Sequence, residues 1–223
     1  MPDKATQLFE FEVESTSMIG PSLITRLQEL CDGVDGVPGG ALVVLRLGGA
    51  EAAAAEDLHG VAVRLVNQWE QALRRLEQLR TPTVAVASGY CSGPALEAML
   101  SCDYRVGAAG LRVRLPLAAG EPWPGMVVHR LGQQLGASRA RKLVLFGAEL
   151  TAAQALEIGL IDDVVETECW TPKQFTLADG LLGSELAIRR RLLLESTSTS
   201  FEEALGAHLA ACDRTLRRVK ATP

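Results

Sequence analysis

The sequence predicts an α/β fold in which short buried strands alternate with amphipathic helices. Two runs indicate strands buried on both faces, residues 41–47 (ALVVLRL) and 83–87 (TVAVA), because each is short, almost wholly apolar and contains valines. Between them, residues 61–79 repeat apolar side chains at the spacing of a helix. Strands followed in turn by helices favour an α/β arrangement over separate all-α and all-β parts.

The other elements of the first half follow from local patterns. Residues 7–13 alternate apolar and charged side chains, which predicts a half-buried strand, and residues 21–31 predict an amphipathic helix that begins at a proline. Thr81-Pro82 ends the helix that precedes the second buried strand. Turns or flexible connections are expected in the segments rich in glycine and other small residues, at 32–40, 48–55 and 89–94.

The second half combines helices with short strands. Thr151 is a suitable N-cap and Gly159 a suitable stop for one helix, and residues 118–125 predict a loop because they hold two prolines and two glycines. Helices are expected at 95–101, 127–135, 138–146, 151–159 and 184–219, the last broken near 196–200, and strands at 104–107, 111–115 and 161–165. We expect a core at 1–170 and a helical region at 171–223 that serves oligomerisation or covers the site.

Composition excludes several classes of protein. The 223 residues are 48% hydrophobic and 22% charged, which suits one packed domain rather than a disordered chain. A net charge of −5 gives no electrostatic footprint for nucleic acid. No apolar run approaches the ~20 residues that cross a bilayer, and the acidic N-terminus lacks the layout of a signal peptide. Five cysteines without metal-site spacing favour reduced thiols, no metal and a cytoplasmic location.

Short basic runs offer no clear ligand site. Residues 189–191 are three consecutive arginines, and Arg217, Arg218 and Lys220 lie near the C-terminus. On a helix such runs are usually solvated faces, so we expect that here, with contact to an anionic ligand as the alternative.

One segment carries a resemblance to a known family. Residues 81–103 read TPTVAVASGYCSGPALEAMLSCD. They run through a proline-led strand, a Gly-Tyr turn, a glycine-rich loop and a glutamate-bearing helix that ends in Cys-Asp. This order closely resembles the core of the crotonase (enoyl-CoA hydratase/isomerase) superfamily.

Two later segments resemble the same family in the same order. Pro124-Gly125, Arg130-Leu131 and the small residues 136–138 resemble its next segment. Residues 147–165 (GAELTAAQALEIGLIDDVV) resemble the stretch in which Thr/Ser-Ala-x-x-Ala-x-x-x-Gly-Leu precedes a strand. The three ordered matches span residues 81–165.

The resemblance implies a fold, an assembly and a chemistry. The fold is a spiral of strand-strand-helix (ββα) units with a helical C-terminal region, here shortened, and the assembly is a trimer or hexamer. The chemistry concerns an acyl-CoA thioester, as substrate or ligand, with no other cofactor. Two backbone N–H groups form an oxyanion hole around its carbonyl oxygen, and one or two carboxylates move protons at the neighbouring carbons.

Glu97 occupies the position of the family's glutamate, eight residues after Gly89. The resemblance implies that it acts as general acid or base on water. The alternative is a carboxylate near a helix N-terminus that the helix dipole favours and that is otherwise idle.

The family's second glutamate is replaced by Leu117, which transfers no protons. Glu121 lies further along the same loop and is the candidate substitute if the loop folds back. The alternative is that Glu121 faces water, because loop tips vary freely.

The oxyanion hole departs most from the family. Pro94 stands where a backbone N–H is expected, three residues before Glu97, and proline has no N–H. Losing one such donor typically costs about 3–4 kcal/mol of transition-state stabilisation. Ala95 is the candidate replacement if the loop is displaced, and Gly93 is free to adopt an unusual backbone angle. For the other donor Ala50 is the candidate, with a mobile surface loop as the alternative.

Three more residues bear on the predicted site. Trp123, between two prolines, is a candidate for lining an acyl pocket together with Leu117, although such aromatics are often loop anchors. His129 is expected to be a surface or packing residue. Cys91 has no evident partner histidine, which argues against nucleophilic catalysis.

Two functions follow. Overall, and in its Gly-Tyr-Cys-Ser-Gly-Pro turn, the sequence most resembles the hydratase-like proteins of dihydroxyphenylglycine biosynthesis (the DpgB type), which belong to antibiotic-type secondary metabolism. The first function is a lyase of the enoyl-CoA hydratase/dehydratase type that dehydrates or aromatises a polyketide thioester toward dihydroxyphenylacetyl-CoA. The second is a non-catalytic partner that stimulates a type III polyketide synthase.

Overall fold

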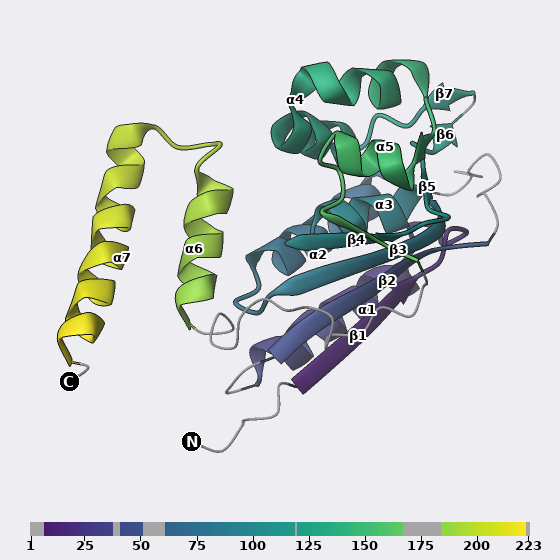
Figure 1. Ribbon diagram of the computed structural model, residues 1–223. Coiled ribbons are helices and arrows are strands. Elements are labelled where there is room, and N and C mark those ends of the chain that lie inside the picture. Colours follow the sequence, from purple (N-terminus) through teal and green to yellow (C-terminus); the bar gives the residue numbers. More distant parts are fainter. Residues whose placement is uncertain (1–6, 38–40, 51–60, 119, 167–183, 222–223) are drawn as a thin grey trace.

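A computed structural model describes residues 7–37, 41–50, 61–118, 120–166 and 184–221. Its centre is a parallel sheet with the strand order β1-β2-β3-β4-β9 (Figure 1). These strands are β1 (Gln7–Val13), β2 (Ala41–Gly49), β3 (Thr83–Cys91), β4 (Tyr104–Ala108) and β9 (Asp163–Val165). The predicted α/β class is confirmed, and so are the predicted strands at 7–13, 41–47 and 83–87.

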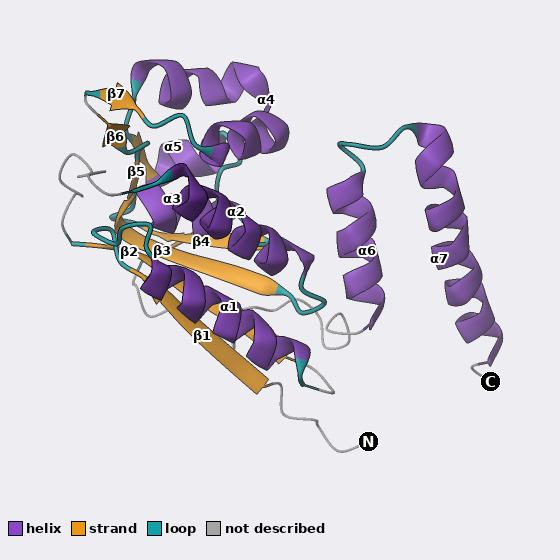
Figure 2. Cartoon of the chain, turned by 180° about the vertical axis from the view of Figure 1, so that it is seen from behind, coloured by secondary structure: helices purple, strands orange, loops and turns teal. Residues whose placement is uncertain are grey.

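Three helices cover one face of this sheet: α1 (Pro21–Asp35), α2 (Val63–Gln78) and α3 (Gly93–Leu100) (Figure 2). The alternation of side chains along β2 shows why its sequence is apolar on both faces. Val43 and Leu45 belong to the main core with the helices, whereas Leu42 and Val44 join a second buried cluster with Val84, Val86 and Val106. Both faces of β2 are therefore buried, as its sequence predicts.

Short elements extend the sheet at the end where the strands finish. The two-residue strand β5 (Arg112–Val113) pairs with the end of β3 and with β8 (Leu150–Thr151). Helix α5 (Ala152–Glu157) follows directly, and its predicted N-cap is confirmed: Thr151 and Gln154 form a reciprocal capping box.

A helical layer lies beyond this end of the sheet (Figure 1). It contains α4 (Met126–Phe146), α5 and the hairpin of β6 (Leu117–Ala118) and β7 (Glu121–Pro122). The two helices predicted at 127–135 and 138–146 are the two halves of α4, which is kinked where Gly136 has φ +75°.

The C-terminal helices α6 (Ser184–Glu195) and α7 (Phe201–Ala221) form an antiparallel pair beside the sheet (Figures 1 and 2). An ion pair of 2.7 Å joins Arg218 on α7 to Glu185 on α6. The predicted break near 196–200 is confirmed. The predicted boundary between residues 170 and 171 lies outside the described residues.

Arg190 corrects the expectation of a solvated arginine run. It is only 7% exposed, and its guanidinium donates hydrogen bonds to the backbone carbonyls of Leu76, Leu79 and Thr81, at the C-terminal end of α2. It also pairs with Asp103 at 2.5 Å. The last carbonyl groups of a helix have no hydrogen-bond partner within the helix. The buried guanidinium of Arg190 supplies that partner and caps the C-terminal end of α2.

Several predicted boundaries were wrong. β3 continues to Cys91 and α3 begins at Gly93, which leaves little of the turn predicted at 89–94. The loop predicted at 118–125 contains β7 and part of β6, and the strand predicted at 111–115 is reduced to two residues. Small residues and glycines in the sequence indicated where the chain bends, but not where the hydrogen-bonded pairing of strands stops.

Within the described residues, no helix is long and apolar enough to span a membrane.

Candidate active site

Glu97 lies in α3, the shortest of the helices on the covered face of the sheet and one whose residues are all buried. The carboxylate is 3% exposed. A charged side chain at such a position needs hydrogen-bond donors, because burial without them costs several kcal/mol. The surroundings of Glu97 therefore determine what it can do.

The indole of Trp69 supplies one donor. Its Nε1 donates a hydrogen bond of 2.6 Å to Oε2 of Glu97, from the middle of α2 across to α3. Trp69 is itself fully buried, so the bond is shielded from water. A hydrogen bond of this kind holds the carboxylate in one orientation.

The other carboxylate oxygen faces Gly125, at the start of α4. A Cβ atom placed on Gly125 would lie 3.1 Å from Oε1 of Glu97 and 2.5 Å from Nε1 of Trp123. A side chain at position 125 would force the Trp123 ring to move. The structure thus places Trp123, a predicted pocket residue, beside the same glycine as Glu97.

The start of α3 carries the predicted oxyanion residues. Gly93 has φ +53°, a left-handed conformation that favours glycine, and Pro94 occupies the first helical turn. Ala95 lies in the same turn, whose N–H groups have no partner within a helix. The hydroxyl of Ser92, the N-cap residue, is buried and has no hydrogen-bond partner among the described residues.

Ala50 follows the last residue of β2, next to the turn within β3. A Cβ on Gly89, which has φ +57°, would lie 2.2 Å from the carbonyl oxygen of Gly49 and 3.5 Å from the nitrogen of Ala50. Backbone contact this close requires glycine at position 89. Ala50 is therefore next to the β3 segment that leads into α3, and the residues that follow it, 51–60, lie outside the described residues.

Leu117 and Glu121 lie in the β6–β7 hairpin. Leu117 is half-buried, and its Cδ2 lies 4.0 Å from the Cβ position of Gly147, at the end of α4. Glu121 is exposed. The geometry thus leaves Glu97 as the buried carboxylate of the predicted set, and the substitution of Glu121 for a second carboxylate stays a prediction.

Three comparisons with known proteins bear on this arrangement. A family model described as enoyl-CoA hydratase/isomerase matches residues 50–222, which is most of the chain. The chain belongs to the enoyl-CoA hydratase/isomerase (crotonase) family. A relative from Amycolatopsis orientalis, named an enoyl-CoA hydratase, is 42% identical over 201 residues, covering 90% of this chain and 92% of the relative.

Solved structures of enoyl-CoA hydratase/isomerase proteins share the fold. An enoyl-CoA hydratase from Bacillus anthracis superposes with a TM-score of 0.75 at 22% identity, over 96% of this chain and 90% of that one. An enoyl-CoA hydratase/isomerase family protein from Silicibacter pomeroyi gives 0.78 at 17% identity, over 94% and 96%. At these identities the likeness shows the fold alone.

A buried ion cluster links α4 to α2, the helix that carries Trp69. Arg130 of α4 donates to Glu70 at 2.7 Å and to Glu77 at 2.8 Å, both on α2. Burial alone would lower the pKa of Arg130, but the charges of Glu77 and Glu70 and their hydrogen bonds raise it. The cluster ties α4, which begins beside Gly125, to the helix that carries Trp69.

Sequence reasoning missed both the Trp69 contact and this cluster. In the sequence, Trp69 fits the pattern as an apolar residue at helical spacing, and Arg130 as part of a family motif. The available signal was the pair of acids Glu70 and Glu77, two turns apart on one face of α2. Nothing local pointed to an arginine more than 50 residues away as their partner.

Neither Cys91, His129 nor a metal-binding cluster adds to the candidate site. Burial raises the pKa of Cys91 to about 12, so it carries a neutral thiol at physiological pH. His129 is exposed on α4. Among the described residues, no group of three or more His, Cys, Asp or Glu side chains is placed to hold a metal ion.

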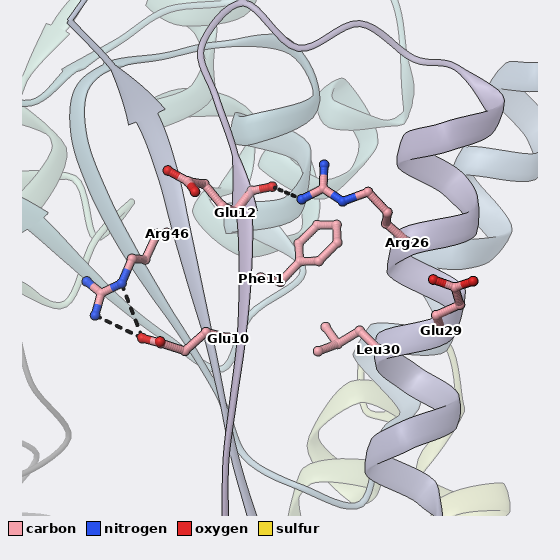
Figure 3. Close-up of a pocket in the computed structure, with 7 residues that line it drawn as sticks. All are labelled: Glu10, Phe11, Glu12, Arg26, Glu29, Leu30 and Arg46. Carbon is pink, nitrogen blue, oxygen red and sulfur yellow. Dashed lines mark hydrogen bonds and ion pairs between the residues drawn. The ribbon is translucent and has the colours of Figure 1, made fainter.

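A surface hollow of about 540 Å³ lies between β1 and α1, away from Glu97 (Figure 3). Both of its arginines have protein partners: Arg46 pairs with Glu10 at 2.9 Å, and Arg26 donates to the carbonyl oxygen of Glu12 at 3.2 Å. The Arg26 guanidinium also lies over the Phe11 ring, 5.2 Å from its centre. Because its arginines are already engaged in this way, the hollow does not suggest an acyl-CoA site.

Proposed function

We propose that the protein binds an acyl-CoA thioester and that Glu97 moves a proton on it, in a lyase reaction of the enoyl-CoA hydratase/dehydratase type. The observation that supports this most is the buried 2.6 Å hydrogen bond between Trp69 and Glu97, within a fold shared with enoyl-CoA hydratases. Burying a charged carboxylate costs free energy that donors of this kind have to offset. A glutamate with a purely structural role would therefore gain little from being buried. A buried, oriented carboxylate is what proton transfer needs.

The chemistry can be followed in the dehydration direction. Glu97 accepts a proton from the carbon next to the thioester carbonyl, and negative charge develops on the carbonyl oxygen. The Glu97 carboxyl group then donates the proton to the departing hydroxyl group, so that water leaves and a carbon-carbon double bond forms. Hydration is the reverse, and one carboxylate serves both proton transfers.

The thioester oxygen requires donors other than residue 94. The first-turn N–H of Ala95 and the hydroxyl of Ser92 are the polar groups that fit this role at the start of α3. Ala50 is the candidate on the opposite side. Since Glu97 is 3% exposed, substrate entry also requires the segment that carries Trp123 and Gly125 to move.

The proposed substrate is a polyketide-derived thioester that is dehydrated or aromatised toward dihydroxyphenylacetyl-CoA. Its support is the resemblance of residues 89–94 and of the overall sequence to hydratase-like proteins of dihydroxyphenylglycine biosynthesis. The absence of a carboxylate at Leu117 fits a reaction driven partly by the stability of an aromatic product.

Calorimetric titration with acetyl-CoA tests the binding step. Micromolar affinity, about −8 kcal/mol, would support an acyl-CoA site at α3. No detectable heat with acetyl-CoA or with a longer enoyl thioester would contradict the proposal and favour the alternative below.

Replacing Pro94 by glycine is expected to raise turnover by roughly 100-fold, because it restores a backbone N–H at the oxyanion position. Hydration of an enoyl thioester, followed by the loss of its conjugated ultraviolet absorbance, measures the effect. Pro94→Ala is the matched control, since it also restores the N–H but without the added flexibility of glycine. A rise in both variants indicates the donor, and no rise in either argues against an oxyanion hole at this turn.

The alternative function is a non-catalytic crotonase-fold partner that stimulates a type III polyketide synthase. Pro94 and Leu117 favour it, because both replace parts of the family's catalytic apparatus. It predicts a stable complex with the synthase and stimulation that does not depend on Glu97. Assembly as a trimer or hexamer is expected under either function.

A further inference from the structure

The indole N–H of Trp123 has no acceptor in the part of the chain that the structure describes. The side chain is partly exposed, and its Nε1 forms no hydrogen bond with any described residue. Trp69 differs, because its Nε1 holds Oε2 of Glu97. An indole nitrogen can only donate, so the N–H of Trp123 is a donor that a ligand can use.

This donor lies close to the Glu97 carboxylate. The position that a Cβ atom on Gly125 would take is 2.5 Å from Nε1 of Trp123 and 3.1 Å from Oε1 of Glu97. Because these distances are two sides of a triangle, Nε1 and Oε1 lie no more than about 5.6 Å apart. Cδ1 of the indole is 2.8 Å from the same position, so the edge of the ring that carries the N–H is the edge beside Gly125.

A span of this length suits a single oxygen atom. Hydrogen bonds to or from oxygen are about 2.5–3.2 Å long, so one oxygen that accepts from Nε1 and donates to Oε1 bridges up to about 6 Å. A hydroxyl group has the lone pair and the proton that these two contacts need. A carboxylate oxygen accepts more than one hydrogen bond, so the contact is compatible with others that Glu97 makes.

The β6–β7 hairpin holds the indole in place. The backbone N–H of Trp123 donates to the carbonyl oxygen of Pro116 at 2.8 Å. This bond continues the antiparallel pairing of Leu117 with Pro122. Prolines on both sides of Trp123 further restrict the backbone. The donor is therefore oriented before a ligand binds, whereas Leu117 in the same hairpin has no polar group to offer.

We propose that the Trp123 N–H binds the hydroxyl oxygen of a 3-hydroxyacyl thioester and so selects this class of substrate. The inference rests on the proposed function, because it places that oxygen against Glu97. In dehydration the carbon–oxygen bond breaks, the proton on the Glu97 carboxyl group passes to the oxygen, and water leaves. The indole keeps its own proton, and its hydrogen bond stabilises the negative charge that develops on the departing oxygen. In hydration the same two groups hold the attacking water.

Calorimetric titration with butyryl-CoA and with 3-hydroxybutyryl-CoA tests the contact, because the two ligands differ by one hydroxyl group. The unaltered protein is expected to bind the hydroxy compound about 5- to 10-fold more tightly, the usual contribution of one hydrogen bond. Trp123→Phe keeps an aromatic ring without the N–H and is expected to lose most of this preference. Leu117→Ala removes packing from the same hairpin but no hydrogen bond, so this matched control is expected to keep the preference.

The ratio of the two dissociation constants separates the N–H from packing, because lost packing weakens both ligands alike. Equal affinities in the unaltered protein, or a full preference in Trp123→Phe, would overturn the inference and leave the proposed function standing. An equal loss of preference in Trp123→Phe and Leu117→Ala would also overturn it, since the cause would be hairpin packing. No binding of either thioester would contradict the proposed function itself.

Turnover gives a second readout. Exchange of the hydrogens next to the thioester of butyryl-CoA with deuterated water reports proton removal by Glu97 without any hydroxyl group in the ligand. Trp123→Phe is expected to lower dehydration of 3-hydroxybutyryl-CoA at least about 10-fold more than it lowers this exchange. Equal losses in the two reactions would show that Trp123 acts on Glu97 or on the chain as a whole, and would overturn the assignment to the hydroxyl oxygen.

Discussion

Replacing Glu97 by glutamine is expected to lower turnover of an acyl-CoA thioester by about 100- to 10,000-fold, the usual effect of removing a general acid or base. Glutamine keeps an oxygen that can accept the Trp69 N–H, so the fold is expected to survive. The loss should appear in kcat, because the amide still fills the space of the carboxylate while no longer moving a proton.

Trp69→Phe separates orientation from proton transfer. It keeps an aromatic ring in the core and removes the donor to Glu97, so a smaller loss of turnover is expected than with Glu97→Gln. The same two variants decide between the proposed functions. The catalytic proposal is wrong if the Glu97→Gln variant turns over the thioester as fast as the unaltered protein. It is also wrong if the unaltered protein shows no turnover and the variant still stimulates a synthase fully.

Arg130→Met is expected to lower the free energy of unfolding by about 3–5 kcal/mol, because it leaves two carboxylates in a buried site without their partner. Arg130 is 8% exposed, and Glu70 and Glu77 are also largely covered. Arg74 still pairs with Glu77 from the surface, which favours the lower end of this range. Urea denaturation measures the change as a shift of the midpoint at constant slope.

Two controls accompany this variant. Arg112→Met removes one side of an exposed 4.0 Å pair with Glu149 and is expected to change stability by less than about 1 kcal/mol. Adding Glu70→Gln and Glu77→Gln to Arg130→Met removes the uncompensated charges and is expected to restore part of the loss. If Arg130→Met and Arg112→Met cost the same, the cluster contributes no more than a surface pair.

The fold could be predicted largely from the sequence because its central strands are buried on both faces. Runs such as 41–47 and 83–87 have no polar face, and only a sheet covered on both sides accommodates them. Element ends were less predictable. Gly89 marks a sharp conformation inside β3 rather than the end of the strand, because a neighbouring backbone, that of Gly49, approaches it there.

The candidate site was predictable only where a motif fixed the spacing. Glu97 follows Gly89 at the family's distance, and the structure places it in a buried helix. Trp69 and Arg190 were not assigned their partners, since those partners lie 28 and as many as 114 residues away. Periodicity shows which side of a helix is apolar, but it does not show what a buried N–H or guanidinium meets.

The capping of α2 by Arg190 has a consequence for how the chain folds as it is made. Leu79 and Arg190 are 111 residues apart, so a ribosome that has completed α2 must add that many residues before the cap exists. At ~5–20 residues per second this takes roughly 5–20 s. During that interval the carbonyls at the end of α2 depend on water, and the sheet of the nascent domain can form before the α6–α7 pair is fixed to it.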